Sequence, residues 1–156
     1  MEPSAQSGIY ASQLLQSVSA MVSGGFSMAL TKTARTLVAT TTNAAGATTR
    51  GTLDLNGAQG PSRLTLSIAN GPVAPTTQCT ARVLIAHSTT LPAPASAGAN
   101  WKTLFPPVSP GVAANAANGW TYPIGREIMC LEVEFTGNTG QAVTIEAYLS
   151  ELTTQS

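Results

Sequence analysis

From Gly25 onward, apolar and polar residues alternate along the chain, which is the period-two pattern of half-buried β-strands. In residues 62–71 (SRLTLSIANG), Leu64, Leu66 and Ile68 share one face, and the final Asn-Gly pair is a turn signal. The same alternation, bordered by Gly, Asn or Pro, predicts further strands in GFSMALT (25–31), TLVATTT (36–42), TLDLNG (52–57) and CTARVLIAH (79–87).

The last part of the chain, residues 126–152, reads REIMCLEVEFTGNTGQAVTIEAYLSEL. It predicts two strands joined in a hairpin by TGNTG, because Gly and Asn supply the positive φ of tight turns. On the first strand, one set of alternate residues is apolar, whereas Glu132 and Glu134 are predicted to lie on the exposed face. On the second strand, alternate residues from Val143 to Leu149 are predicted to face inward.

Seven or eight short strands separated by Gly-, Pro- and Asn-rich loops predict an all-β chain, either an antiparallel β-sandwich or a small barrel. The low-complexity stretch TTTNAAGATTRG (40–51) is predicted to be a hairpin loop or an exposed tip. The β-sandwich domain is expected to span residues 25–156.

Residues 1–24 are predicted to form an N-terminal arm or a short helix. Apolar residues in the segment 9–22 follow helical spacing, and Gly24 and Gly25 would end such a helix. A docked extended arm fits as well, and unordered termini are common. Because this uncharged, partly apolar segment has no place in a sandwich core, we expect an arm that packs on a neighbouring subunit. Its candidate contact residues are Ile9, Tyr10, Leu14, Leu15 and Val18.

Charged residues make up only 9% of the chain, and the seven basic and seven acidic residues cancel. A neutral chain gives no overall signal for nucleic acid, and no segment has the ~18 apolar residues of a membrane helix. The N-terminus lacks the basic start of a signal peptide, which favours synthesis in the cytoplasm. A polar surface rich in Thr and Ser, with a net charge near zero, favours packing against other protein surfaces.

Residues that could carry catalysis are few. His87 is the single histidine and Asp54 the single aspartate. There is no nucleophile elbow, phosphate loop, dinucleotide-binding glycine pattern or metal motif. Cys79 and Cys130 lie in apolar runs and are predicted to be reduced core thiols, although a bridge between them stays open. The sequence therefore predicts a non-enzymatic protein without cofactor or metal.

The segment LPAPASAGANWKTLFPPVSPG (91–111) places two large aromatic residues among five prolines. Proline removes an N–H donor, so this segment cannot be a central strand. Trp101 and Phe105 are predicted to hold a stiff loop against the sandwich or, as a sharper hypothesis, against a neighbouring subunit. Trp120 and Tyr122 are predicted to anchor loops, and together with Trp101 they are candidates for stacking on a sugar.

Four features of the sequence together resemble one family of proteins. They are the neutral charge, the Ser-, Ala- and Gln-rich arm, the Pro-rich loops (LPAPASAG, FPPVSPG) and the alternating C-terminal segment. They are similar to small virion proteins of tailed bacteriophages, especially capsid decoration (cement) proteins with a jelly-roll-like sandwich. The resemblance implies a protein on the virion surface that binds the major capsid protein and itself, as a trimer or another oligomer. Two alternatives stay open: a tail, baseplate or fibre-attachment component, and a carbohydrate- or surface-binding module.

Overall fold

The computed structural model of the chain describes residues 30–97 and 101–154, and all its elements there are β-strands. The predicted arm, residues 1–24, lies outside the described residues, as do its five candidate contacts and the predicted domain boundary. The strands are β1 (Leu30–Asn43), β2 (Thr49–Asp54), β3 (Ser62–Asn70), β4 (Thr80–Ala86), β5 (Lys102–Val108), β6 (Ala117–Ile124), β7 (Cys130–Thr136) and β8 (Val143–Thr154).

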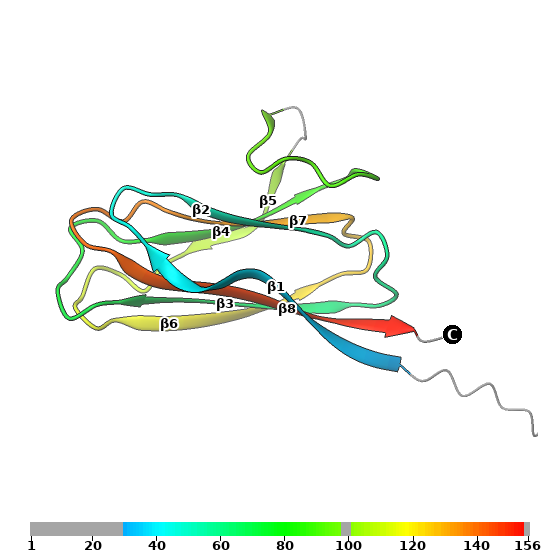
Figure 1. Ribbon diagram of the computed structural model, residues 1–156, viewed down its shortest axis with the longest axis horizontal. Helices are drawn as coiled ribbons and strands as arrows, with labels where there is room; N and C mark the ends of the chain where they lie inside the picture. The colour runs from blue at the N-terminus through cyan, green and yellow to red at the C-terminus, as the bar shows by residue number, and fades with distance from the viewer. Residues whose placement is uncertain (1–29, 98–100, 155–156) are drawn as a thin grey trace, which may run out of the picture. The chain divides into compact units, whose positions relative to one another are not determined.

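Two four-stranded antiparallel sheets lie face to face (Figure 1). The first sheet has the order β1-β8-β3-β6 and the second the order β2-β7-β4-β5. Of the eight described strands, only β4 and β5 are both consecutive in the chain and neighbours in a sheet, and every other connection between these strands crosses from one sheet to the other. This arrangement is a jelly roll. The predicted all-β antiparallel sandwich with a jelly-roll-like order is therefore confirmed.

The predicted hairpin of β7 and β8 is wrong. Both strands are present, but β7 pairs with β2 and β4, whereas β8 pairs with β1 and β3. Gly137 and Gly140 in the connecting loop adopt positive φ (97° and 78°), as the turn composition predicts. The loop connects β7 of the second sheet to β8 of the first. An alternating pattern fixes which face of a strand is apolar and leaves its partner undetermined.

The first connection departs from the prediction for a similar reason. The stretch 40–51, predicted to be a hairpin loop or an exposed tip, is mostly strand, because β1 runs to Asn43 and β2 begins at Thr49. The short turn between them leads from the first sheet to the second. The predicted run 36–42 and the end of the run 25–31 belong to one strand, β1, whose register shifts near Val38.

The core lies between the two sheets and is formed by the apolar strand faces that the sequence predicts. Leu64, Leu66 and Ile68 on β3 are fully buried, and so are alternate residues of β8 from Val143 to Leu149. The buried core residues are Val38, Leu53, Leu55, Leu64, Leu66, Ile68, Cys79, Ala81, Val83, Ile124, Ile128, Leu131, Val133, Phe135, Val143, Ile145, Ala147 and Leu149.

Prolines mark an outer strand of each sheet. Pro106 and Pro107 lie in β5, the outermost strand of the second sheet, and Pro123 lies in β6, the outermost strand of the first. Because proline cannot donate a ladder hydrogen bond, these strands are poor templates for further strand addition. The prediction that the Pro-rich segment is not a central strand is confirmed.

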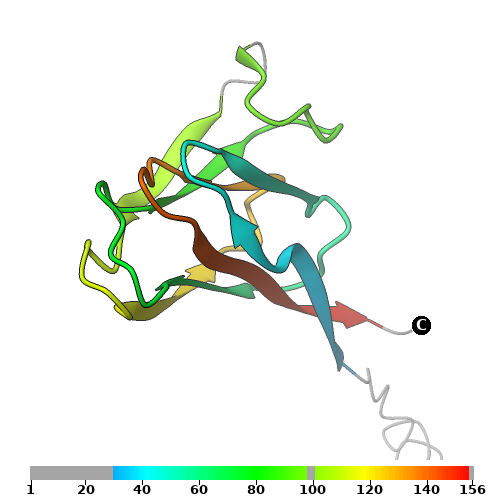
Figure 2. The same ribbon diagram turned by 60° about the vertical axis from the view of Figure 1, so that its left-hand side comes forward.

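On the opposite side of the sandwich, β1 of the first sheet passes close to β2 of the second (Figure 2). A Cβ atom on Gly51 would clash with the backbone carbonyl of Leu37 and with the side chain of Val38. The close approach of the two strands therefore requires glycine at this position.

Replacing Gly51 with alanine is expected to lower the free energy of unfolding by about 1–3 kcal/mol, because backbone atoms of β1 must move away. Urea unfolding of the variant measures the loss. Gly57→Ala is the matched control, since a Cβ atom there meets nothing within 4 Å. Equal stability of the two variants would show that β1 and β2 are not in close contact.

Candidate functional site

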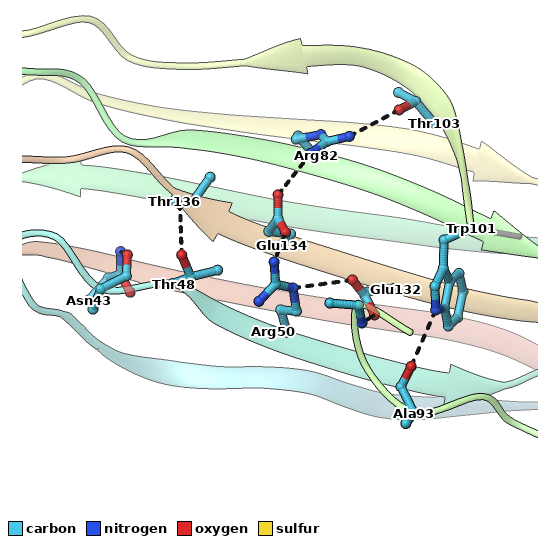
Figure 3. A network of polar contacts seen from close by, with 12 residues as sticks. Asn43, Thr48, Arg50, Arg82, Ala93, Trp101, Thr103, Glu132, Glu134 and Thr136 are labelled. Carbon is cyan, nitrogen blue, oxygen red and sulfur yellow. Dashed lines mark hydrogen bonds and ion pairs between the residues drawn. The ribbon is translucent and has the colours of Figure 1, made fainter. Parts of the chain in front are cut away.

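A row of charged side chains crosses the outer face of the second sheet. Glu134 on β7 lies opposite Arg50 on β2 and opposite Arg82 on β4 in the strand register. Its carboxylate accepts hydrogen bonds from both guanidinium groups, with 3.1 Å between Arg82 Nη1 and Glu134 Oε1 (Figure 3). Arg82 also reaches Thr103 on the edge strand β5, at 3.5 Å from Nη2 to Oγ1. The row therefore links all four strands of the sheet.

Glu132, two residues before Glu134 on β7, connects this row to the loop between β4 and β5. One carboxylate oxygen lies 3.4 Å from Arg50 Nε, and the other accepts a hydrogen bond of 2.9 Å from the backbone N–H of Ala95. Ala95 has a positive φ of 56°, an unfavourable conformation for a residue with a Cβ atom. The hydrogen bond to Glu132 helps to stabilise this unfavourable backbone conformation of Ala95. Below, Arg50, Arg82, Glu132 and Glu134 are called the ionic network.

The prediction that Glu132 and Glu134 are exposed is wrong: they are only 1% and 6% exposed. The alternation itself is read correctly, since both glutamates do face away from the core side of β7. The β4–β5 loop lies against Glu132 at Ala95, and the side chains of Arg50 and Arg82 contact Glu134. Neither neighbour is close in sequence, so the local pattern does not reveal the burial. An ionised carboxylate can be buried only where cations and hydrogen-bond donors surround it.

A groove of about 340 Å³ lies between the loop and the outer face of the second sheet. Beyond the ionic network, its lining includes Leu84, Trp101, Lys102 and the loop residues 95–97. The sequence offers one hint of a role for Arg82, which occupies a polar position in the predicted strand 79–87, whereas Arg50 falls in the stretch 40–51 that is predicted to be a hairpin loop or an exposed tip. Neither was singled out as a site residue.

The aromatic residues that the sequence singles out fall into two separate places. The indole N–H of Trp101 donates a hydrogen bond of 3.3 Å to the carbonyl of Ala93, which joins two parts of the β4–β5 loop to each other (Figure 3). Phe105 on β5 stacks on Tyr122 on β6, with 4.4 Å between the ring centroids and 16° between the planes. Trp120, two residues from Tyr122, also packs against the core.

The Phe105–Tyr122 stack joins the outer strands of the two sheets and covers the core on that side. Burial raises the pKa of Tyr122. Phe105 lies in strand β5, and Trp120 and Tyr122 lie in strand β6, so these side chains pack strands against the core, whereas the sequence predicted that they anchor loops. Because Trp101 lies on the outer face of the second sheet, the structure does not bring Trp101, Trp120 and Tyr122 together into one sugar-stacking platform.

Other groups that could carry chemistry are placed as follows. Both cysteine thiols are free and buried. Burial raises the pKa of Cys79 to about 11, and burial together with the charge of Asp54 raises that of Cys130. Both thiols are therefore poor nucleophiles at neutral pH. Among the described residues, no three His, Cys, Asp or Glu side chains gather as a metal site, and no helix could span a membrane.

The outer face of the first sheet carries a smaller polar cluster. Glu146 on β8 accepts hydrogen bonds from the hydroxyls of Thr40 and Ser67, at 2.6 and 2.9 Å. These two bonds lower the pKa of the Glu146 carboxyl, since they stabilise its ionised form.

No protein-family model matches the sequence, and no curated protein is similar to it. Among solved structures, a chain of the infectious bursal disease virus Gx strain shares 11% identity at a TM-score of 0.45, over 80% of this chain and 32% of that one. A family 16 carbohydrate-binding module shares 11% identity at a TM-score of 0.39, over 75% and 76% of the two chains.

The cleaved adhesin domain K3 of Lys-gingipain from Porphyromonas gingivalis shares 12% identity at a TM-score of 0.41, over 67% of this chain and 62% of that one. The present chain spans about a third of the infectious bursal disease virus chain. The similar structures thus include viral, carbohydrate-binding and adhesin chains, and at these scores they carry no argument about function.

Replacing Glu132 with alanine is expected to release the loop without unfolding the sheet. Loss of a hydrogen bond to a charged acceptor is worth about 1.5–3 kcal/mol, so exchange of the Ala95 amide should accelerate by roughly tenfold or more. Native-state hydrogen exchange measures the exchange rate of the Ala95 amide, and Glu146→Ala on the first sheet is the control. An unchanged exchange rate at Ala95 in the Glu132 variant would refute the anchoring role.

Proposed function

We propose that this chain is a non-enzymatic virion structural protein, a capsid decoration protein that binds the outer capsid lattice and reinforces it. The observation that supports this best is the use of the ionic network. Its two buried carboxylates are bonded to guanidinium groups and to the backbone of Ala95. Charges in the groove therefore hold a loop in a fixed conformation, which is a task of a structural scaffold.

A rigid scaffold suits reinforcement of a lattice. The core of the sandwich lies within the described residues. The Pro-rich β4–β5 loop is held to the sheet by the bond from Ala95 to Glu132, and within the loop Trp101 bonds to Ala93. A loop that is already ordered loses little conformational entropy when a partner binds it. A neutral surface does not repel a large protein array, and many weak contacts across such an array sum to a stable attachment.

In this proposal the arm, residues 1–24, provides a second attachment to the capsid. Removing it is expected to leave the urea unfolding midpoint unchanged, because the core draws on residues 38–149. Binding to particles that lack the protein should weaken. Cosedimentation of both forms with such particles measures the effect, and full-length chain carrying Leu14→Ser and Val18→Ser serves as a matched variant. An unfolded truncated chain would contradict the proposal that the arm is a separate element.

Copy number in a purified particle separates the capsid from the tail. A decoration protein should be present in proportion to the major capsid protein, and particles containing it should resist heating better than particles without it. A copy number that matches a single vertex or a tail would replace the proposal with the tail or baseplate alternative.

The groove supports one second candidate, a module that binds a polar ligand such as a sugar. Trp101 lies at its wall, and Lys102, also in its lining, forms no ion pair among the described residues. A glycan panel tests this candidate with Trp101→Ala and, as the control, Trp120→Ala. Glycan binding that is lost only with Trp101 would favour this candidate over the capsid role.

A further inference from the structure

Within the described part of the chain, the loops at one end of the sandwich carry no charged side chain. The loops β1–β2, β3–β4, β5–β6 and β7–β8 meet at this end, which is the left-hand end in Figure 1. They comprise residues 44–48, 71–79, 109–116 and 137–142, here called the uncharged loop end, and none is Asp, Glu, Lys, Arg or His. At the opposite end, the β6–β7 loop includes Arg126 and Glu127. The absence of charge is therefore a property of one end.

Hydrogen bonds hold the four loops to one another. The fully buried Asn138 donates to the carbonyls of Asn43 and Ala44 and accepts a bond of 2.7 Å from the Asn43 side chain. Between the β3–β4 and β7–β8 loops, the backbone of residues 76–77 bonds to that of Thr139. The uncharged loop end is therefore held in a defined conformation in the single chain.

Two exposed valines stand on this ordered surface. Val73 is 59% exposed and Val112 is 47% exposed, and both belong to the small set of large apolar side chains exposed among the described residues. Their loops are bonded together, since Asn115 N–H donates to the carbonyl of Gly71 at 2.9 Å and the side chain of Asn70 donates to the β5–β6 loop. The end thus combines rigidity, apolar side chains and no charge.

We propose that copies of this chain associate with one another through the uncharged loop end, around a rotation axis. Residues close to such an axis lie near their own copies, so a charge there would face a like charge. A surface without charge avoids that repulsion. A partner of different sequence would be recognised better by complementary charges, which also speed the encounter, and this end has none. Nucleic acid is disfavoured too, because it needs cations.

The inference rests on the chemistry of this surface and not on the proposed capsid role. It predicts association driven by apolar contact and by hydrogen bonds of loop backbone. Such association should depend little on salt, because no ion pair forms across the interface.

Sedimentation equilibrium of the full chain tests the inference over a range of concentrations and at two salt concentrations. The wild type should form a discrete oligomer that is insensitive to salt. The double variant Val73→Glu, Val112→Glu should raise the dissociation constant at least about tenfold, because like charges then meet at the axis. Leu91→Glu is the matched control, since Leu91 is also exposed (40%) but belongs to the β4–β5 loop, and it should behave like the wild type.

A crosslinking experiment locates the interface directly. Val112→Cys in the full chain, treated with a short bismaleimide, should give crosslinked oligomers, whereas Leu91→Cys should not. The native cysteines do not interfere, because both are buried with raised pKa values. A monomeric wild type would overturn the inference. So would an oligomer that keeps its affinity in the double glutamate variant and resists crosslinking at residue 112.

Discussion

The candidate site depends on the ionic contacts of the Glu134 carboxylate with the guanidinium groups of Arg50 and Arg82. Three adjacent strands contribute these side chains, so the interaction exists only when β2, β7 and β4 are paired in the observed register. Removing the carboxylate would leave two cations close together. Replacing a whole buried ion pair by apolar residues is often neutral for stability, which suggests that this network specifies a geometry.

That geometry determines where the Pro-rich segment lies. Among the strands that the structure describes, β4 and β5 alone are consecutive and paired, so the loop between them begins and ends in the second sheet. Glu132 holds the loop to the sheet at Ala95, and the Trp101–Ala93 bond joins the two halves of the loop. β5 then continues along the edge of the second sheet, where Phe105 stacks on Tyr122 of the first. A charged contact on the outer face and an aromatic contact at the edge thus hold the same segment.

Alternation alone predicted most of the strands and their inward faces, as the burial of Leu64, Leu66 and Ile68 shows. Proline chemistry correctly placed β5 away from the centre of a sheet. The pairing of the strands could not be predicted from the sequence, since the period-two pattern is equally compatible with a β7–β8 hairpin and with strands in opposite sheets. The candidate site was missed for the same physical reason, because Arg50, Arg82 and Glu134 are far apart in sequence and meet only through sheet register.

Arg50 and Glu134 are expected to interact as a coupled pair within the network, and not as two independent solvated side chains on a strand surface. A double-mutant cycle with Arg50→Met and Glu134→Met, followed by urea unfolding, measures their interaction directly. We expect a favourable coupling free energy of roughly 1–3 kcal/mol, in the range observed for residues in contact within one network. Additive effects of the two substitutions, with a coupling near zero, would contradict it.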